Sequence, residues 1–128
     1  MANQFIPYGR QHITQTDIDA VVAVLQSDFL TQGSQVPAFE ERVAAYTGAK
    51  FGVAVNSATS ALHIACLALG LGQGEKGKDD WLWTTPITFT ASANCGLYCG
   101  ANIDFVDIDP LTLNMLIYAL VEKLQLAN

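Results

Sequence analysis

Charge, and positive charge above all, is scarce in this chain. Only 14% of its 128 residues are charged, and six Lys and Arg residues face twelve Asp and Glu residues, giving a formal net charge of −6. Proteins that bind nucleic acid need basic patches to neutralise phosphates, so this balance argues against such a partner. The sequence also lacks an apolar run of the ~20 residues that cross a bilayer, and its first residues lack the pattern of a signal peptide. We expect a cytoplasmic protein with no nucleic-acid or membrane partner.

Cysteine and histidine are few as well. The three cysteines, Cys66, Cys95 and Cys99, are too few for a disulfide framework. No histidine stands near Cys95 and Cys99 in the sequence to complete a metal site. We therefore expect no bound metal, and thiols that are buried as small apolar groups. His12 and His63 are isolated, and we expect a structural or solvent-facing role for each.

The first half of the chain predicts helices. With 51% hydrophobic residues the composition is globular, and 128 residues are enough for one domain. Residues 1–12 show no periodic pattern, which predicts an extended arm. Apolar residues then recur at helical spacing over Thr16–Ser27 and over Pro37–Tyr46, and Gly48 suits a left-handed helix end. The loop between the two helices, Phe29–Ser34, carries apolar residues that we expect to be exposed.

Three short apolar segments follow and alternate with helical patterns. The segments are Phe51–Val55, Trp81–Thr85 and Ile103–Asp107, and the helical patterns cover residues 58–69 and 89–99. The order strand, helix, strand, helix, strand predicts parallel strands joined by right-handed crossovers. We therefore predict an α/β fold with three parallel strands and helices.

Polar connections follow each of these segments. They are Ser57–Ser60, Pro86–Thr90 and Asp107–Asp109. Because ligands of parallel sheets bind beyond the carboxyl ends of the strands, we expect a binding site at this edge. The connector Gly70–Asp80 contains G-x-G-x-G, but it does not lead from a strand into a helix, so we interpret it as a solvated turn. A last helical pattern covers Leu116–Leu126.

The turn after the first apolar segment is the most informative feature of the sequence. It passes from Val55 through the small polar stretch Asn56–Ser60 into a helix. Backbone N–H groups at a helix start have no intrahelical acceptor, and with the macrodipole they favour a phosphate or a carboxylate. Small residues let an anion approach the backbone, and the hydroxyls of Ser57, Thr59 and Ser60 are further donors. An ordinary strand–helix connection capped by Ser57 has the same pattern, and this alternative stays open.

Five blocks of the sequence follow one family pattern in order and at matching spacing. They are Pro7–Gln11, Leu30–Gly33, Asn56–Leu62, Thr85–Asn94 and Val106–Asp109. Together they resemble the DegT/StrS-type sugar aminotransferases, pyridoxal-phosphate (PLP) enzymes of the aspartate aminotransferase fold, fold type I. The resemblance covers nearly the whole chain. It implies that residues 1–128 form the N-terminal portion of the large domain of such an enzyme, with the C-terminal small domain absent.

The same resemblance assigns residues to the cofactor. It implies that Ser57, Ala58 and Thr59 hold the phosphate of PLP through backbone and hydroxyl donors. It also implies that Phe89 stacks on the pyridine ring, and stacking of this kind fixes the plane of the ring. Without the family, Phe89 would be interpreted as a core residue.

The resemblance also assigns residues to the substrate. Those that would face the sugar nucleotide are Tyr8, Asp28, Phe29, Leu30 and Thr31; without the family they are a surface arm and a loop between helices. The stretch Pro86–Ala101 is similar to the transaminases of pseudaminic-acid synthesis. That similarity implies amination at C4 of a UDP-linked 4-keto-6-deoxy-N-acetylhexosamine, with glutamate as the amino donor, by an enzyme that is a homodimer at full length.

The chain departs from the family in its lysines. In the family, the lysine that forms the Schiff base with PLP and the acid that faces the ring nitrogen both lie beyond residue 128. None of the four lysines present matches that position: Lys50, Lys76, Lys78 and Lys123. We therefore expect no catalytic residue in this chain and no transamination by it alone. The connector Glu75–Asp80 is longer than usual, and Met115–Asn128 drifts from the family pattern.

Two alternatives to the aminotransferase remain open. One is a non-catalytic α/β domain that binds a phosphorylated ligand. The other is a structural remnant that pairs through exposed apolar surface.

Overall fold

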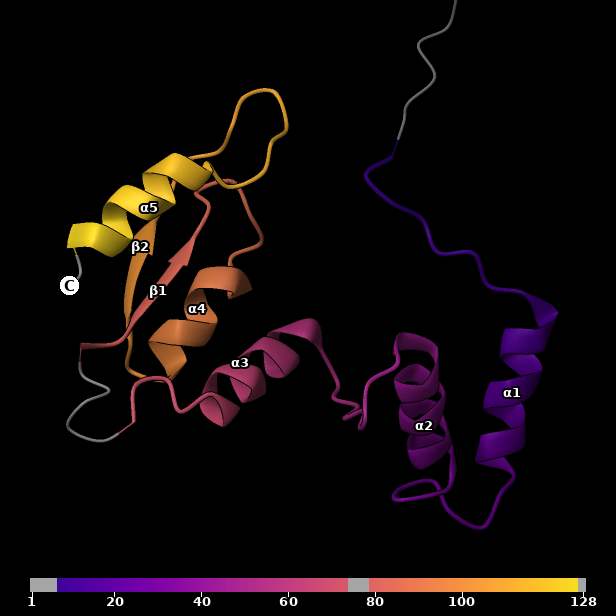
Figure 1. Cartoon of the computed structure of the whole chain (residues 1–128). Helices are drawn as coiled ribbons and strands as arrows, with labels where there is room; N and C mark the ends of the chain where they lie inside the picture. The colour runs from indigo at the N-terminus through magenta and orange to yellow at the C-terminus, as the bar shows by residue number, and fades with distance from the viewer. Residues whose placement is uncertain (1–6, 74–78, 127–128) are drawn as a thin grey trace, which may run out of the picture. The chain divides into compact units, whose positions relative to one another are not determined.

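The computed structural model describes residues 7–73 and 79–126 of the chain. The chain divides into two compact units, Met1–Ala54 and Val55–Asn128, and each is described by itself. Figure 1 shows that the described part of the first unit contains helices only, whereas the second combines helices with a small sheet.

The first unit holds two helices, α1 (Gln15–Leu25) and α2 (Gln35–Thr47). Helix α1 begins earlier than the sequence pattern predicts, because Thr14 forms the capping box. The Thr14 hydroxyl accepts a hydrogen bond from the Asp17 amide at 3.4 Å, and the Asp17 carboxylate accepts one from the Thr14 amide at 2.7 Å. Helix α2 ends at Gly48, whose φ of 74° is left-handed as predicted.

The apolar stripes of these two helices are not covered within the first unit. Among its described residues, Ala44 alone is buried. The residues of the predicted stripes are more than one-third exposed: Ile18, Val21, Val22, Leu25, Val36, Phe39, Val43 and Tyr46. The predicted helices are therefore present, but no hydrophobic core forms between them.

The predicted strand over Phe51–Val55 is wrong. This segment has no regular secondary structure, and Phe51 and Val53 are exposed. It lies against α2 instead: the amide of Ala54 donates to the Glu40 carboxylate at 2.8 Å. A strand exists only where a neighbouring strand completes its hydrogen bonds, and no described strand pairs with this segment.

The second unit contains the sheet. Strands β1 (Trp81–Thr84) and β2 (Asn102–Phe105) are parallel, in a register that pairs Trp81 with Asn102 and Thr84 with Phe105. The described residues therefore form two of the three predicted strands, each within a residue or two of its predicted bounds. Helix α4 (Ala91–Tyr98) makes the crossover between them, as the parallel arrangement requires.

Opposite faces of this sheet meet different helices. On one face, α4 approaches so closely at Gly96 that an added Cβ would lie 2.5 Å from Cδ1 of Ile103. On the other face, Lys123 of α5 (Ile117–Leu126) forms an ion pair with Asp104 of β2. Ile103 and Asp104 are successive strand residues and point to opposite sides, so α4 and α5 cover opposite faces (Figure 1).

Helix α3 (Ala58–Ala68) packs against α4 and completes the second unit. His63 meets Tyr98 edge to face, with ring centroids 5.3 Å apart, which confirms its structural role. The buried apolar residues of this unit are Cys66, Ala91, Cys95, Ala101 and Val106. As predicted, these cysteines are free thiols packed in the core.

Two sequence expectations concern the whole described chain. Residues 7–73 and 79–126 contain no cluster of side chains that could hold a metal ion. No helix among them is long and apolar enough to cross a membrane. The middle of the connector Gly70–Asp80, with Lys76 and Lys78, lies outside the described residues. Its ends are joined by a hydrogen bond from the Gly72 amide to the Asp80 carboxylate at 2.9 Å.

Candidate functional site

The start of α3 is organised by three polar side chains. The Ser57 hydroxyl accepts a hydrogen bond from the Ser60 amide at 3.1 Å, so Ser57 is the N-cap. The Ser60 hydroxyl donates to Oδ1 of Asn56 at 2.9 Å. Because that bond uses the single hydroxyl hydrogen of Ser60, Ser57 must be the donor in the 3.0 Å contact between the two hydroxyls. Both serine hydroxyls therefore serve the cap and have no hydrogen left to donate to a ligand.

The donors that remain at this turn are those of Ala58 and Thr59. Their amides form no hydrogen bond with another described residue, and neither does the Thr59 hydroxyl. Ala58 is exposed and Thr59 is half-buried. The first turn of α3 holds no acidic residue that would repel an anion. Two free amides, one hydroxyl and the positive end of a helix dipole are the donor set that suits a phosphate, so these residues fit the phosphate of PLP.

Helix α1 shows that this arrangement is not common to every helix start in the chain. Its first turn carries Asp17, and the carboxylate of Asp17 binds the backbone of the cap residue Thr14. This hydrogen bond lowers the pKa of Asp17, so the carboxylate stays ionised. A negative charge therefore already occupies the start of α1, whereas the start of α3 is open to an anion.

Phe89 lies in the connection between β1 and α4. Its carbonyl accepts a hydrogen bond from the Ser92 amide at 2.8 Å, which ties the residue to the first turn of α4. The side chain of Phe89 is 64% exposed, so it is not the core residue that the pattern alone favours. Figure 1 shows the chain entering α3 and α4 from the same side of the second unit.

The third polar connection has a different role. The Asp109 carboxylate accepts hydrogen bonds from the amides of Thr112 at 2.9 Å and Leu111 at 2.7 Å. These two bonds lower the pKa of Asp109, with Thr112 contributing more. Asp107 likewise accepts from the Ile108 amide at 2.8 Å. Both carboxylates stabilise the local turn.

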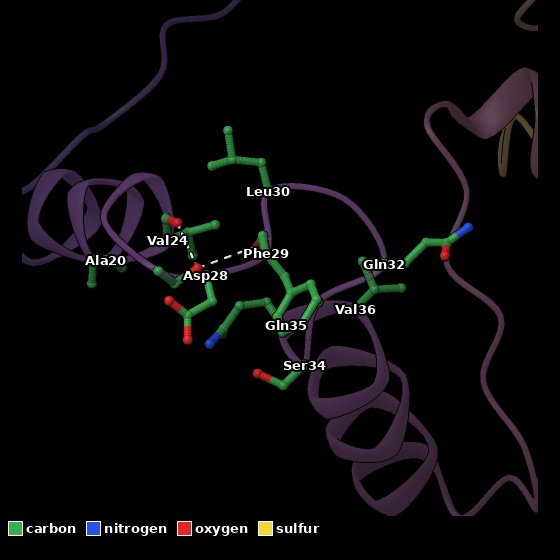
Figure 2. A pocket seen from close by; sticks show the side chains of 12 residues that line it. Ala20, Val24, Asp28, Phe29, Leu30, Gln32, Ser34, Gln35 and Val36 are labelled. Carbon is green, nitrogen blue, oxygen red and sulfur yellow. Dashed lines mark hydrogen bonds between the residues drawn. The ribbon is translucent and has the colours of Figure 1, made fainter.

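The first unit contains a pocket of about 520 Å³ at the bend between α1 and α2 (Figure 2). Its lining is formed by Ala20, Ala23, Val24, Ser27, Asp28, Phe29, Leu30, Gln32, Gly33, Ser34, Gln35 and Val36. The Ser27 hydroxyl lies 2.7 Å from the carbonyl oxygen of Val24 and 3.2 Å from that of Phe29, so its single hydrogen is shared between two acceptors, which the dashed lines of Figure 2 mark. The Ser27 side chain therefore ties the end of α1 to the start of the bend.

The pocket gathers part of the predicted substrate-binding set. Asp28, Phe29 and Leu30 line it, whereas Thr31 and Tyr8 do not. Tyr8 is fully exposed in the arm before α1. Sequence reasoning missed the polar lining residues Gln32, Ser34 and Gln35, because nothing in a periodic pattern shows how a loop folds back. The only signal available was the family block Leu30–Gly33, which includes Gln32.

The site residues are distributed over both units. Tyr8 and the loop Asp28–Thr31 belong to the first unit, and Ser57–Thr59 and Phe89 belong to the second. Each group is therefore a separate local feature: a pocket lined by a loop, and a helix start accompanied by an exposed ring.

Sequence comparison identifies relatives of this chain. The DegT/DnrJ/EryC1/StrS aminotransferase family model matches residues 11–125. A UDP-4-amino-4,6-dideoxy-N-acetyl-beta-L-altrosamine transaminase of Campylobacter jejuni is 46% identical over 103 residues, which are 80% of this chain and 26% of that protein. The spore coat polysaccharide biosynthesis protein SpsC of Bacillus subtilis is 42% identical over 113 residues, 88% of this chain and 28% of that protein.

Solved structures agree with the sequence relatives. The putative sugar aminotransferase Spr1654 of Streptococcus pneumoniae, in its PLP form, superposes with a TM-score of 0.82 at 32% identity, covering 91% of this chain and 29% of that one. The sugar aminotransferase CalS13 of Micromonospora echinospora gives a TM-score of 0.78 at 32% identity, covering 93% and 31%. These neighbours confirm fold type I, and this chain spans between a quarter and a third of the length of each relative. The chain therefore belongs to the DegT/DnrJ/EryC1/StrS aminotransferase family.

Proposed function

We propose that this chain supplies the phosphate-binding turn and part of the sugar-nucleotide site of a PLP-dependent sugar aminotransferase. The observation that carries the proposal is the start of α3. There Ser57 is committed to the cap, while the amides of Ala58 and Thr59 and the Thr59 hydroxyl remain open. Family membership gives this turn its ligand, because solved relatives include PLP and PMP forms.

Each residue of the second unit has a defined task in this proposal. Ala58 and Thr59 bind the phosphate, and Ser57 holds their amides in position through its bond to Ser60. The exposed ring of Phe89 stacks on the cofactor ring and fixes its plane. When bound, PLP supplies an electron sink that allows an amino group to pass between an amino acid and a keto sugar.

The first unit takes the substrate in this proposal. The pocket lined by Asp28, Phe29 and Leu30 lies within the volume range of small-molecule sites. The name of the Campylobacter jejuni relative supports a UDP-linked amino sugar as the product. From the family resemblance we propose a UDP-linked 4-keto-6-deoxy-N-acetylhexosamine as the acceptor and glutamate as the donor. Tyr8 and Thr31 lie outside the pocket lining, and we assign them to the sugar nucleotide from the family resemblance alone. A homodimer is the proposed assembly of the whole enzyme.

The chemistry itself needs a lysine at the family position. None of the four lysines here stands there, so we propose that the lysine and the acid facing the ring belong to the larger remainder of such an enzyme. The 128-residue chain, supplied with PLP, glutamate and a UDP-4-keto sugar, is then expected to form no amino sugar. Turnover at even about one per second, an ordinary enzymatic rate, would contradict this assignment.

Titration with inorganic phosphate and with PLP, followed by amide NMR shifts, tests the site. Binding is expected at residues 57–62 with a dissociation constant of about 1 mM. Thr59→Val removes one hydrogen bond of about 1 kcal/mol, so it should weaken both ligands about fivefold. Phe89→Ala should weaken PLP alone, since inorganic phosphate has no ring.

A matched control is Thr16→Val, because Thr16 holds the same second position in α1 that Thr59 holds in α3. This variant should leave both affinities unchanged. Shifts that map away from residues 57–62, or an equal loss in both threonine variants, would refute the assignment of the phosphate site.

A further inference from the structure

Three thiols with no part in the proposed function meet where α3 and α4 end together. Cys66 lies in the last turn of α3, Cys95 in the middle of α4, and Cys99 is the C-cap of α4. The thiol of Cys66 interacts with the thiols of both other residues. Figure 1 shows the two helices ending on the same side of the second unit.

Backbone packing fixes this meeting of the helix ends independently of the thiols. The carbonyl of Cys66 accepts a hydrogen bond from the Leu71 amide at 3.1 Å. One residue further on, Gly72 lies so close to the end of α4 that an added Cβ would be 1.9 Å from the Cys99 carbonyl oxygen. The turn after α3 is therefore wedged against Cys99, so the ends of the two helices that carry Cys66 and Cys99 lie side by side.

The three cysteines differ in what can reach them. Cys66 and Cys95 are buried at 8% and 3% exposure, whereas Cys99 is half-buried. The Cys95 thiol donates a hydrogen bond to the Ser92 carbonyl at 3.5 Å within its own helix. Burial, with smaller contributions from Cys95 and Cys99, raises the pKa of Cys66 to about 11. A reagent in solution therefore meets Cys99 first, and Cys66 is the partner behind it.

We propose that Cys66 and Cys99 form an oxidation site, at which a low-molecular-weight disulfide such as oxidised glutathione generates a Cys66–Cys99 disulfide that joins α3 to α4. Cys95 is not the partner of Cys99. Residues four apart on one helix have Cβ atoms roughly 5–6 Å apart, whereas a disulfide requires about 3.5–4.5 Å.

The reaction balances as two exchange steps. The Cys99 thiolate attacks one sulfur of oxidised glutathione; the S–S bond breaks and one glutathione thiolate leaves. The sulfur of Cys66 then attacks the Cys99 sulfur of the mixed disulfide, and the second glutathione leaves. The protons of Cys66 and Cys99 end on the two glutathione thiols, so the protein loses two electrons and oxidised glutathione gains them.

The new bond would close a loop that contains β1, the Phe89 connection and α4. Closing a loop restricts the unfolded chain, so the oxidised protein should melt several degrees higher than the reduced one. Tryptophan fluorescence reports this transition, because both tryptophans lie in β1.

The test treats the reduced 128-residue chain with oxidised glutathione and follows intact mass and linked peptides. Wild type should lose two hydrogens, link the Cys66 and Cys99 peptides, and retain one free thiol, at Cys95. Cys66→Ala should stop at a glutathione adduct on Cys99, and Cys99→Ala should react at least tenfold more slowly. Cys95→Ala is the matched control and should cross-link as wild type does.

Other products would overturn the proposal. These are a Cys66–Cys95 link, cross-links between two chains without an internal one, or a Cys66→Ala variant that still loses two hydrogens. If a variant fails to fold, wild type alone decides, through the position of its remaining free thiol. Wild type unfolded in guanidinium should give a mixture of pairings, and a Cys66–Cys99 link that is equally selective there would not come from the fold.

Discussion

The two units of this chain have similar helical patterns but very different interiors. In the first unit, Phe39 and Val43 of the α2 stripe are 60% and 40% exposed. In the second, Ala91 and Cys95 of α4 are 4% and 3% exposed. The difference is the sheet: β1 and β2 offer two faces for helices to cover, whereas the first unit has no described strand. An amphipathic pattern thus shows which face needs a partner without showing where the partner is.

The first unit exposes apolar side chains along both of its helices, and a surface of this kind is suited to association with another protein. Large apolar side chains stay at the surface along both helices and the loop between them, including Leu25, Phe29 and Leu30. Contiguous patches of this kind mark interfaces or aggregation sites. Nothing among the described residues covers this surface.

The largest difference between the units should appear on core truncation. Val106 is 0% exposed in the second unit, and Val43 is 40% exposed on α2. Val106→Ala should lower the free energy of unfolding of the second unit by about 2 kcal/mol, through lost burial and a cavity. Val43→Ala makes the same chemical change and should alter stability by less than about 0.5 kcal/mol, as surface substitutions do. Urea denaturation followed by tryptophan fluorescence and circular dichroism measures both.

Equal losses from the two substitutions would break the comparison. They would mean that another part of the protein covers Val43 in solution. Dilution would then show whether that cover comes from a second copy or from the same chain. Cover provided by a second copy should be lost as the protein is diluted, whereas cover within one chain should not.

Much of this fold follows from local sequence signals. Ser57 before an apolar helical run predicts the start of α3, and Gly48 predicts the end of α2. The strand predicted at Phe51–Val55 is absent because a strand also needs a neighbour, and a short apolar run says nothing about whether one is present. Contacts between residues distant in the sequence could not be predicted from periodicity either. An example is the Lys123–Asp104 ion pair, whose residues are nineteen apart.

The candidate site likewise has one part that local sequence predicts and one part that it does not. The turn at Ser57–Thr59 was predictable because its physics is local: a cap, a dipole and free amides lie within four residues. What the sequence left open was which hydroxyl donates, and the bond from Ser60 to Asn56 decides that question. The pocket lining around Gln32 depends on how a loop bends back, which no spacing rule describes.

A glycine pair gives the next largest expected effect. Gly48 and Gly100 end helices in the two units with φ of 74° and 84°, and neither has an atom within 4 Å of an added Cβ. Alanine at either position should cost about 1 kcal/mol, from left-handed backbone strain alone. Gly100→Ala should shift the tryptophan-detected unfolding of the second unit, whereas Gly48→Ala should change only the helical signal of the first. A shift of tryptophan unfolding by Gly48→Ala would show that the units unfold together.

Removing a helix cap should have a slightly smaller effect. Thr14 caps α1 and Ser57 caps α3 by the same bond to the third helical amide. Each change to alanine should cost about 1 kcal/mol or less locally. Because α1 has no buried face to hold it, Thr14→Ala should melt much of α1, whereas α3 should persist in Ser57→Ala through its packing on α4. Residue-specific amide exchange distinguishes the two, and loss of α3 together with retention of α1 would reverse the comparison.

The smallest expected difference is the response to acid. The pKa of Asp104 lies below its ordinary value of 3.8, and the largest cause is the ion pair with Lys123. The pKa of Asp17 is also lowered, and the largest cause is the hydrogen bond from the Thr14 backbone. A carboxyl whose folded pKa is depressed contributes stability that is present above its unfolded pKa and is lost as pH falls through the folded pKa. Both contributions should therefore be intact above about pH 5 and should fade below about pH 4. Since both carboxylates face solvent, the effects should be small, and salt should weaken that of the ion pair further.

Asparagine substitutions assign each part of the acid response to its unit. Asp104→Asn should flatten the acid dependence of tryptophan-detected stability in the second unit and leave α1 unchanged. Asp17→Asn should flatten only the acid loss of α1 helicity, because its partner lies within the same helix start. Stability that rises on acidification in wild type would contradict the sign of both pKa shifts. If the second unit of Asp104→Asn still loses stability in acid, another carboxyl is responsible. Asp109 is then the next residue to substitute, because the amides of its turn also lower its pKa.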